Sequence, residues 1–188
     1  LNEVLSMGFR GEALASIGAV SKLTIITAEG ELGTKVVCDG GNLVDVSAAS
    51  RQHGTTIEVR DLFFNMPARK KFQRSAAVST GEISRMMTKL SLAYPEVGFV
   101  ALANDRELIR SEGGDLEARM RDVLGRGFAA SVRQVDYEDE GIEVKGFIGL
   151  PRSARLNRSG QYLFVNGRCV NSPLVSDAAL EGYGTMLP

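Results

Sequence analysis

Two glycines flank a phenylalanine and an arginine near the start of the chain, in the stretch Gly8-Phe9-Arg10-Gly11. Residues 12–17 have apolar side chains at helical spacing, so Gly11 is expected at a helix N-terminus. Unpaired N–H groups and the positive end of the helix dipole favour an anion there, and a glycine lets it approach closely. Arg10 adds a forked, charged donor. These residue types indicate phosphate binding; the alternative is a helix cap with Arg10 in solvent.

Basic residues gather in two runs that contain no acidic residue. The run from 65 to 74 holds Arg69, Lys70, Lys71 and Arg74, and the run from 151 to 168 holds Arg152, Arg155, Arg158 and Arg168. Acidic residues are concentrated elsewhere, at positions 136–143. Because the net charge is only -1, attraction to nucleic acid must come from such local patches. The runs suit sequence-independent contacts with DNA phosphates, and the alternative for each is a solvated face.

The pair Asn166-Gly167 is the strongest hairpin signal in the chain, because both residue types adopt the positive φ of a type I′ turn. Arg168 directly follows this turn and is expected to contact the DNA backbone. An arginine beside a rigid turn loses little freedom on binding phosphate. The alternative is that Arg168 pairs with a carboxylate such as Glu181.

Composition excludes several classes of protein. With 188 residues, of which 44% are hydrophobic, the chain can form one domain or two small ones. Cys38 and Cys169 lie far apart and make no disulfide framework, which favours the reducing cytoplasm. His53 is the only histidine, so no zinc site is expected. No apolar run reaches the roughly 18 residues of a membrane helix, and no membrane partner is expected.

The elements that would position these residues follow from hydrophobic periodicity. Strands are predicted at 21–29, 33–41, 42–50 and 54–64, as an antiparallel meander with its clearest turn at residues 39–42. Ser79 and Glu82 form a capping box that predicts the start of an amphipathic helix reaching Pro95. Two strands, 97–104 and 106–112, are expected to join at Asn104 and Asp105.

The sequence Glu112-Gly-Gly-Asp-Leu116 is the best candidate linker, since two glycines precede an aspartate that can cap the next helix. A domain boundary is predicted there. The second part then reads as that helix, three strands (131–139, 141–151 and 160–168) and a helix over 174–183. Helices mixed with a largely antiparallel sheet predict the α+β class.

Three stretches resemble motifs of one family, the MutL family of DNA mismatch repair proteins. GFRGEALASIGAV, from Gly8, resembles its ATP lid; residues 54–72 resemble its Gly-Thr-Thr and Asn-x-Pro-Ala-Arg-x-Lys-Phe segments; and residues 162–170 resemble its Val-Asn-Gly-Arg hairpin. They occur in family order and span nearly the whole chain. The resemblance implies the later part of a GHKL-type ATPase domain at 1–112 and a truncated domain like domain 2 of ribosomal protein S5 at 113–188.

The resemblance also implies site residues, a cofactor and partners. The lid residues Gly8, Phe9, Arg10, Gly11 and Glu12 would contact the phosphates of ATP, with Mg in the intact parent, and Thr55 would lie on the adenine side. The partners implied are the DNA backbone, a mismatch recognition protein of the MutS type, and a second copy that dimerises on ATP binding. The expected location is the bacterial cytoplasm, with nucleoid association during repair.

The family's catalytic Glu, Mg-binding Asn and Asp-x-Gly-x-Gly motif would lie upstream of Leu1, and its second-domain lysine beyond Pro188. The chain is therefore expected to be an internal fragment that does not hydrolyse ATP alone. One alternative is part of a type II topoisomerase ATPase subunit, against which NMPARKKF and VNGR argue. The other is a non-catalytic module that binds DNA or a partner.

Overall fold

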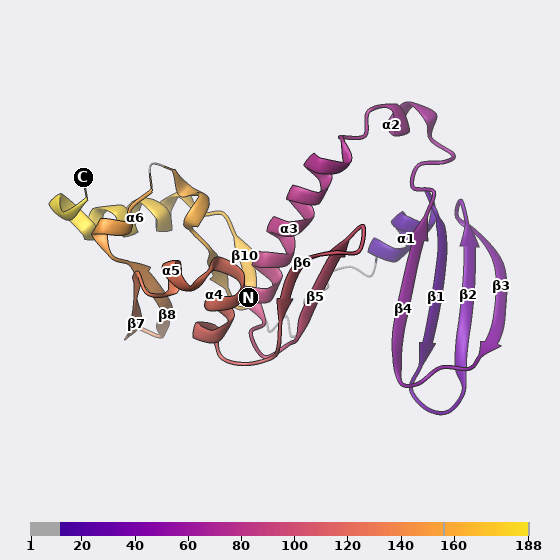
Figure 1. The fold of residues 1–188 in the computed structure, drawn as a ribbon, viewed down its shortest axis with the longest axis horizontal. Helices are drawn as coiled ribbons and strands as arrows, with labels where there is room; N and C mark the ends of the chain where they lie inside the picture. The colour runs from indigo at the N-terminus through magenta and orange to yellow at the C-terminus, as the bar shows by residue number, and fades with distance from the viewer. Residues whose placement is uncertain (1–11, 156, 188) are drawn as a thin grey trace. The chain divides into compact units, whose positions relative to one another are not determined.

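The computed structural model describes residues 12–155 and 157–187 and divides the chain into two compact units, residues 1–75 and 76–188 (Figure 1). Each unit combines helices with antiparallel strands, which confirms the predicted α+β class. The predicted lid residues Gly8, Phe9, Arg10 and Gly11 lie outside the described residues.

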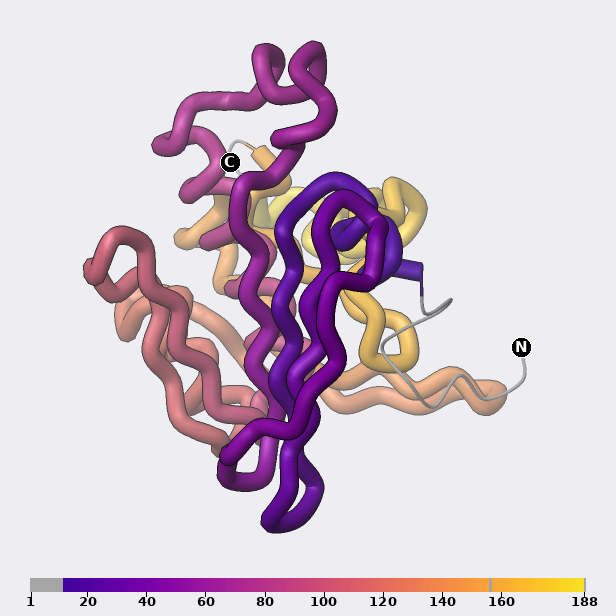
Figure 2. The backbone as a smooth tube through the Cα atoms, turned by 90° about the vertical axis from the view of Figure 1, so that its right-hand side faces the viewer, coloured from indigo at the N-terminus to yellow at the C-terminus, as the bar shows by residue number. Residues whose placement is uncertain are grey.

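The first unit is built around a four-stranded antiparallel sheet (Figure 2). Its described elements are α1 (Glu12–Gly18), β1 (Lys22–Ala28), β2 (Gly33–Asp39), β3 (Asn42–Ala49), β4 (Gly54–Arg60) and α2 (Pro67–Lys71). The turn predicted at 39–42 is confirmed, with φ values of 56° at Gly40 and 90° at Gly41. The sheet order is β3-β2-β1-β4, so the fourth strand pairs with the first and the predicted meander is wrong at that strand.

Side-chain alternation explains where β4 pairs. Leu23 and Ile25 of β1 lie opposite Val59 and Ile57 of β4. Cross-strand partners share a face of the sheet, so this register gathers the apolar side chains of both strands on one face. Pairing β4 with β1 therefore extends the apolar face of β1. In the predicted meander, β4 would have paired with β3 instead.

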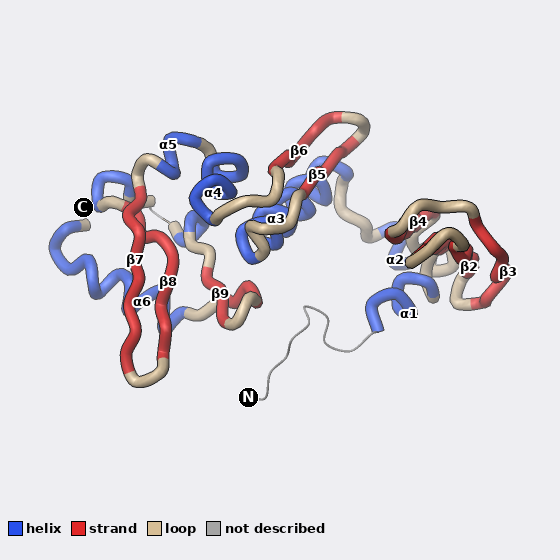
Figure 3. Tube along the Cα trace, turned by 90° about the horizontal axis from the view of Figure 1, so that it is seen from below, coloured by secondary structure: helices blue, strands red, loops and turns tan. Residues whose placement is uncertain are grey.

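The second unit contains more elements in a less continuous sheet. Its described elements are α3 (Ala76–Ala93), β5 (Phe99–Ala103), β6 (Arg106–Ser111), α4 (Leu116–Leu124), α5 (Arg126–Ala129), β7 (Val132–Asp139), β8 (Ile142–Gly149), η1 (Pro151–Ser153), η2 (Arg158–Gly160), β9 (Leu163–Val165), β10 (Arg168–Val170), α6 (Pro173–Tyr183) and η3 (Gly184–Met186). The strands form three hairpins, β5-β6, β7-β8 and β9-β10. Figure 3 shows the β7-β8 hairpin reaching away from α4 and α5.

A small core holds this unit together. Leu92 of α3, Met120 of α4 and Val132 of β7 are buried against one another, 5–7% exposed. Aromatic side chains pack around them, including Phe128 and Phe147. Burial of these side chains is the main force that fixes the helices to the strands.

Two boundaries differ from the sequence prediction, while the turns agree. α3 begins at Ala76, so Ser79 lies inside the helix, where its backbone is already helical and the predicted capping box does not mark the start. The β5-β6 turn has positive φ at Asn104 and Asp105, as predicted. The segment predicted as one strand over 160–168 ends at Val165, where a turn begins.

Candidate nucleotide and DNA-binding residues

The described part of the predicted nucleotide site comprises Glu12 and Thr55. Glu12 is the first residue of α1 and is exposed. Thr55 lies near the start of β4, also exposed, directly opposite Thr27 of β1. The two hydroxyl oxygens are 2.8 Å apart, within hydrogen-bond distance. Thr27 Oγ1 also donates to the Gly54 carbonyl at 3.4 Å.

The Thr27 hydroxyl is a neighbour of Thr55 that sequence reasoning missed. When Thr27 donates to Gly54, the shared hydrogen between the two hydroxyls must come from Thr55. Thr55 then presents oxygen lone pairs, which can accept a hydrogen bond from a ligand amine. A threonine in the first strand and a Gly-Thr-Thr in the fourth gave no sequence signal of this contact, because it depends on which strands pair.

Arg51 holds the Gly-Thr-Thr motif in place through hydrogen bonds to Gly54 and Thr56. Its Nε donates to the Gly54 carbonyl at 3.1 Å, and its Nη1 donates to Thr56 Oγ1. Gly54 has φ of 128°, a conformation that a residue with a side chain rarely adopts. The glycine of this motif is therefore required by the backbone, while Thr55 and Thr56 alternate between the two faces of the sheet.

The loop after β4 is tied to the start of β1. Asn65 donates from Nδ2 to the Ala19 carbonyl at 2.9 Å, and the Phe63 N–H donates to the Val20 carbonyl at 2.6 Å. Lys22 forms an ion pair with Asp61 at 3.0 Å, and this contact raises the pKa of Lys22. The basic run that follows, Arg69, Lys70, Lys71 and Arg74, is exposed at its side chains. These contacts hold the start of the loop against β1, and the exposed basic run follows directly after it.

The predicted arginines of the second unit lie in or next to the segment between β8 and β10. Arg152, Arg155 and Arg158 are exposed and Arg168 is half-buried. Arg168 is the first residue of β10 and pairs with Val165 across the two-residue turn. The turn residues have φ of 49° at Asn166 and 74° at Gly167, which confirms the predicted type I′ turn.

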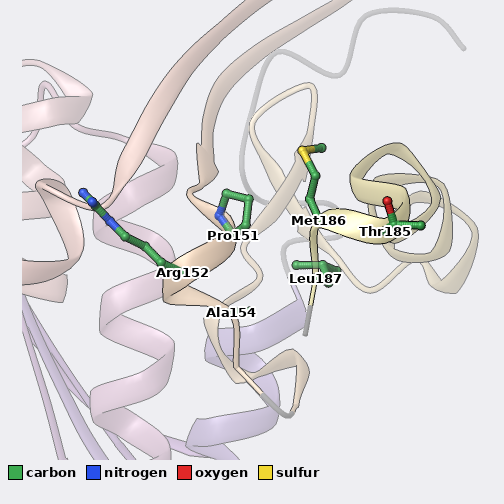
Figure 4. A pocket seen from close by; sticks show the side chains of 6 residues that line it. All are labelled: Pro151, Arg152, Ala154, Thr185, Met186 and Leu187. Carbon is green, nitrogen blue, oxygen red and sulfur yellow. The ribbon is translucent and has the colours of Figure 1, made fainter.

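Arg152 borders a pocket of about 390 Å³. Its other lining residues are Pro151, Ala154, Thr185, Met186 and Leu187. In Figure 4 the Arg152 side chain extends away from Met186 and Thr185, so its guanidinium does not fill the hollow that they line. Among the described residues no hydrogen bond or ion pair is made by this guanidinium, which leaves its donors to solvent or to a ligand.

Arg155 and Arg158 each have a defined neighbour. The Arg155 guanidinium lies 6.0 Å from the centre of the Phe128 ring. Arg158 Nη2 is 2.5 Å from Asp177 Oδ1 of α6, and both side chains are at least half exposed. Exposed ion pairs of this kind contribute little to stability, so Arg158 can exchange its carboxylate for another anion.

Other chemistry is not visible in the described ranges. No group of three or more His, Cys, Asp or Glu side chains there could hold a metal ion. Cys38 and Cys169 are both free. None of the described helices is long and apolar enough to cross a membrane.

Solved structures define the class of protein to which this fold belongs. The chain is similar to the Aquifex aeolicus MutL ATPase domain complexed with ADP, at 26% identity and a TM-score of 0.77 over 90% of this chain and 67% of that one. It also resembles the N-terminal domain of a DNA repair protein, at 23% identity and a TM-score of 0.79 over 95% of this chain and 60% of that one. The fold is that of the ATPase region of mismatch repair proteins.

Sequence relatives identify the family. MutL from Lactococcus lactis is 39% identical over 100% of this chain and 29% of its own length, and MutL from Sinorhizobium medicae is 40% identical over 100% and 32%. The family profile "DNA mismatch repair protein, C-terminal domain" matches residues 120–188. The chain belongs to the MutL family of DNA mismatch repair proteins. It spans about 30% of the length of the curated relatives that it matches.

Proposed function

We propose that this chain is part of an ATP-dependent switch of DNA mismatch repair, in which it contributes to an ATP site and to a surface for the DNA backbone. Relatives named MutL match it over nearly its full length, and a similar solved domain is complexed with ADP. These relatives favour mismatch repair over a topoisomerase ATPase subunit. The whole protein would act in the cytoplasm and couple mismatch recognition to strand processing.

The nucleotide part of the proposal assigns ATP phosphates to Gly8, Phe9, Arg10, Gly11 and Glu12, and the adenine side to Thr55. Mg would accompany the phosphates in the longer protein, where ATP binding would drive dimerisation and favour contact with a MutS-type partner. The hydrogen bond between Thr27 and Thr55 supports a fixed hydroxyl at this position. We keep the domain boundary between residues 112 and 113 as part of this proposal.

The nucleotide assignment is tested in a longer protein that carries this sequence together with its upstream segment. Thr55→Val and Thr27→Val should each weaken binding of a non-hydrolysable ATP analogue. Thr24→Val is the matched control, because Thr24 lies on the same strand but on the opposite face. If all three variants bind the analogue as tightly as the unsubstituted protein does, the result favours the alternative of a DNA or partner-binding module without a nucleotide role.

The observation that carries the DNA proposal is that Arg168 directly follows a rigid turn and closes a run, from 151 to 168, of four arginines without an acidic residue. Arg152, Arg155 and Arg158 are exposed, and Arg168 follows the type I′ turn directly. The Arg168 side chain therefore starts from a backbone position with little freedom, which reduces the entropy lost on binding a phosphate. Contacts of this kind position a protein on a duplex without reading its sequence.

The experiment is a titration of the 188-residue chain with fluorescent duplexes of different sequence at several salt concentrations. Arg168→Glu should weaken binding about tenfold for every sequence and flatten the dependence on salt by roughly one unit of slope. Arg106→Glu is the control, since it makes the same charge change at an exposed position on β6. Unchanged affinity and slope in Arg168→Glu, with unchanged thermal stability, would mean that Arg168 serves another role such as pairing with Glu181.

A further inference from the structure

Arg119 is the largest fully buried side chain among the described residues, at 1% exposure. It lies in the middle of α4, and its guanidinium forms no ion pair with any described carboxylate. A buried charge without an opposite charge is costly unless polar groups of the protein surround it. The acceptors that surround Arg119 therefore define what it does.

Those acceptors are backbone carbonyls from two separate loops. Arg119 Nη2 donates to Pro95 O at 2.8 Å and to Val97 O, both between α3 and β5. The same nitrogen donates to Glu112 O at 3.1 Å, between β6 and α4. The guanidinium carbon also lies 5.2 Å from the centre of the Phe99 ring. One side chain thus joins the two loops that flank the β5-β6 hairpin.

The two loops also touch through their backbones. The Gly114 N–H donates to Pro95 O at 2.9 Å. A Cβ placed on Gly113 would lie 2.2 Å from Glu96 O, so only glycine fits there without movement of a backbone. This contact is independent of Arg119 and brings together the same two segments.

We propose that Arg119 is a clasp that holds residues 95–98 against residues 112–114, so that the end of α3, the β5-β6 hairpin and α4 behave as one rigid body. If the loops separated, the guanidinium would lose its three acceptors while still surrounded by protein. Its Nε and Nη1 already have no hydrogen-bond partner and are buried, so no spare acceptor is at hand. The segment around Gly113, which sequence alone suggests as a linker, is a fixed joint rather than a hinge.

The test is amide hydrogen exchange of the 188-residue chain under strongly native conditions. Arg119→Met removes the charge and the donors but keeps an unbranched apolar side chain. Exchange within residues 94–98 and 112–115 should become about tenfold faster, whereas exchange in β7-β8 should change less than about twofold. Arg121→Met is the matched control on the same helix, because Arg121 is exposed and pairs only with Glu117.

A second variant reaches the joint without touching Arg119. Gly113→Ala should force the loops apart at Glu96 and produce the same local pattern of faster exchange, also if Arg119→Met fails to fold. Local acceleration in these two loops with Arg119→Met, and not with Arg121→Met, supports the clasp, and the same pattern with Gly113→Ala supports the fixed joint that the clasp holds. Acceleration spread evenly over residues 76–187, or no change in the loops, overturns it.

Discussion

One buried arginine and two exposed arginines of the second unit show what burial does to the same side chain. Arg119 is 1% exposed, and one of its nitrogens, Nη2, donates to three carbonyls of its own chain. Arg152 and Arg158 are exposed, the first without a described partner and the second with a single carboxylate. The buried arginine therefore contributes to the stability of the fold. If it separated from its carbonyl partners inside the protein, the hydrogen bonds lost would not be replaced by hydrogen bonds to water.

The exposed arginines keep their donors available. A surface guanidinium exchanges one anion for another at little cost, since water screens both states. The comparison therefore predicts that loss of Arg119 is read in stability, while loss of the exposed arginines is read in binding. Neither effect should appear in the other measurement.

The largest effect is expected for Arg119→Met, which should lower the free energy of unfolding of residues 76–188 by about 3 kcal/mol. All three carbonyls lose this donor. Pro95 O keeps the Gly114 N–H and Glu112 O keeps the Ser111 hydroxyl, but Val97 O is left without another donor among the described residues. A buried acceptor left unpaired costs about 1–3 kcal/mol, and the buried side chain also loses its packing against Phe99. All four tyrosines, Tyr94, Tyr137, Tyr162 and Tyr183, belong to this unit, and the chain contains no tryptophan. Urea titration followed by tyrosine fluorescence thus reports on this unit alone.

Arg121→Met provides the scale for that measurement. Its ion pair with Glu117 at 2.8 Å is exposed and spans one helical turn, so its loss should cost about 0.5 kcal/mol or less. If both variants shift the urea midpoint equally, the carbonyl contacts of Arg119 carry no special weight.

Much of the fold could be predicted because local signals determine it. Alternating apolar residues and turn residues gave the strands β1 to β8, and Asn166-Gly167 gave the β9-β10 turn, since side-chain alternation and positive φ are properties of short segments. The position of β4 beside β1 was missed because pairing between distant strands depends on which faces must be buried together.

The candidate sites divide in the same way. The exposed arginines were visible as a run of like charge, but the contact between Thr27 and Thr55 needed the sheet order. Arg119 was also missed, although it lies on the helical face of Leu116 and Val123, three and four residues away. A basic residue in an apolar stripe is a usable signal, but only the two loops that supply its acceptors reveal what it binds.

The second largest effect is expected for Arg152→Ala, and it should appear in DNA binding and not in stability. Arg152→Ala should weaken duplex binding about fivefold at low salt and reduce the salt slope by roughly one unit, because its donors have no described partner to leave. Tyrosine fluorescence should show an unchanged urea midpoint. If Arg152→Ala instead lowers the urea midpoint and leaves duplex affinity unchanged, Arg152 stabilises the fold, as Arg119 does, and does not contact DNA.

A smaller effect of opposite sign is expected when the competitor of a phosphate is removed. Asp177→Asn abolishes the charge that holds Arg158 at 2.5 Å, so Arg158 no longer has to leave a carboxylate before it contacts DNA. Affinity should rise about twofold to threefold, in line with the small free energy of an exposed ion pair. The double variant Asp177→Asn with Arg158→Ala should lose this gain; if the gain persists, it arises from net charge rather than from Arg158.

The smallest effect is expected from adding one methyl group at Gly160, and it compares directly with the same change at Gly113. A Cβ on Gly160 would lie 3.3 Å from Cδ of Arg155, which is a flexible side chain on the surface. Gly160→Ala should therefore move Arg155 by a few tenths of an ångström, change duplex affinity less than about twofold and leave the urea midpoint where it is. At Gly113 the methyl group meets the Glu96 carbonyl at 2.2 Å, where backbone must move. If Gly113→Ala and Gly160→Ala leave the urea midpoint equally unchanged, the joint at Gly113 is looser than its contacts indicate. The contrast between the buried Arg119, which holds that joint, and the exposed arginines would then lose its structural basis.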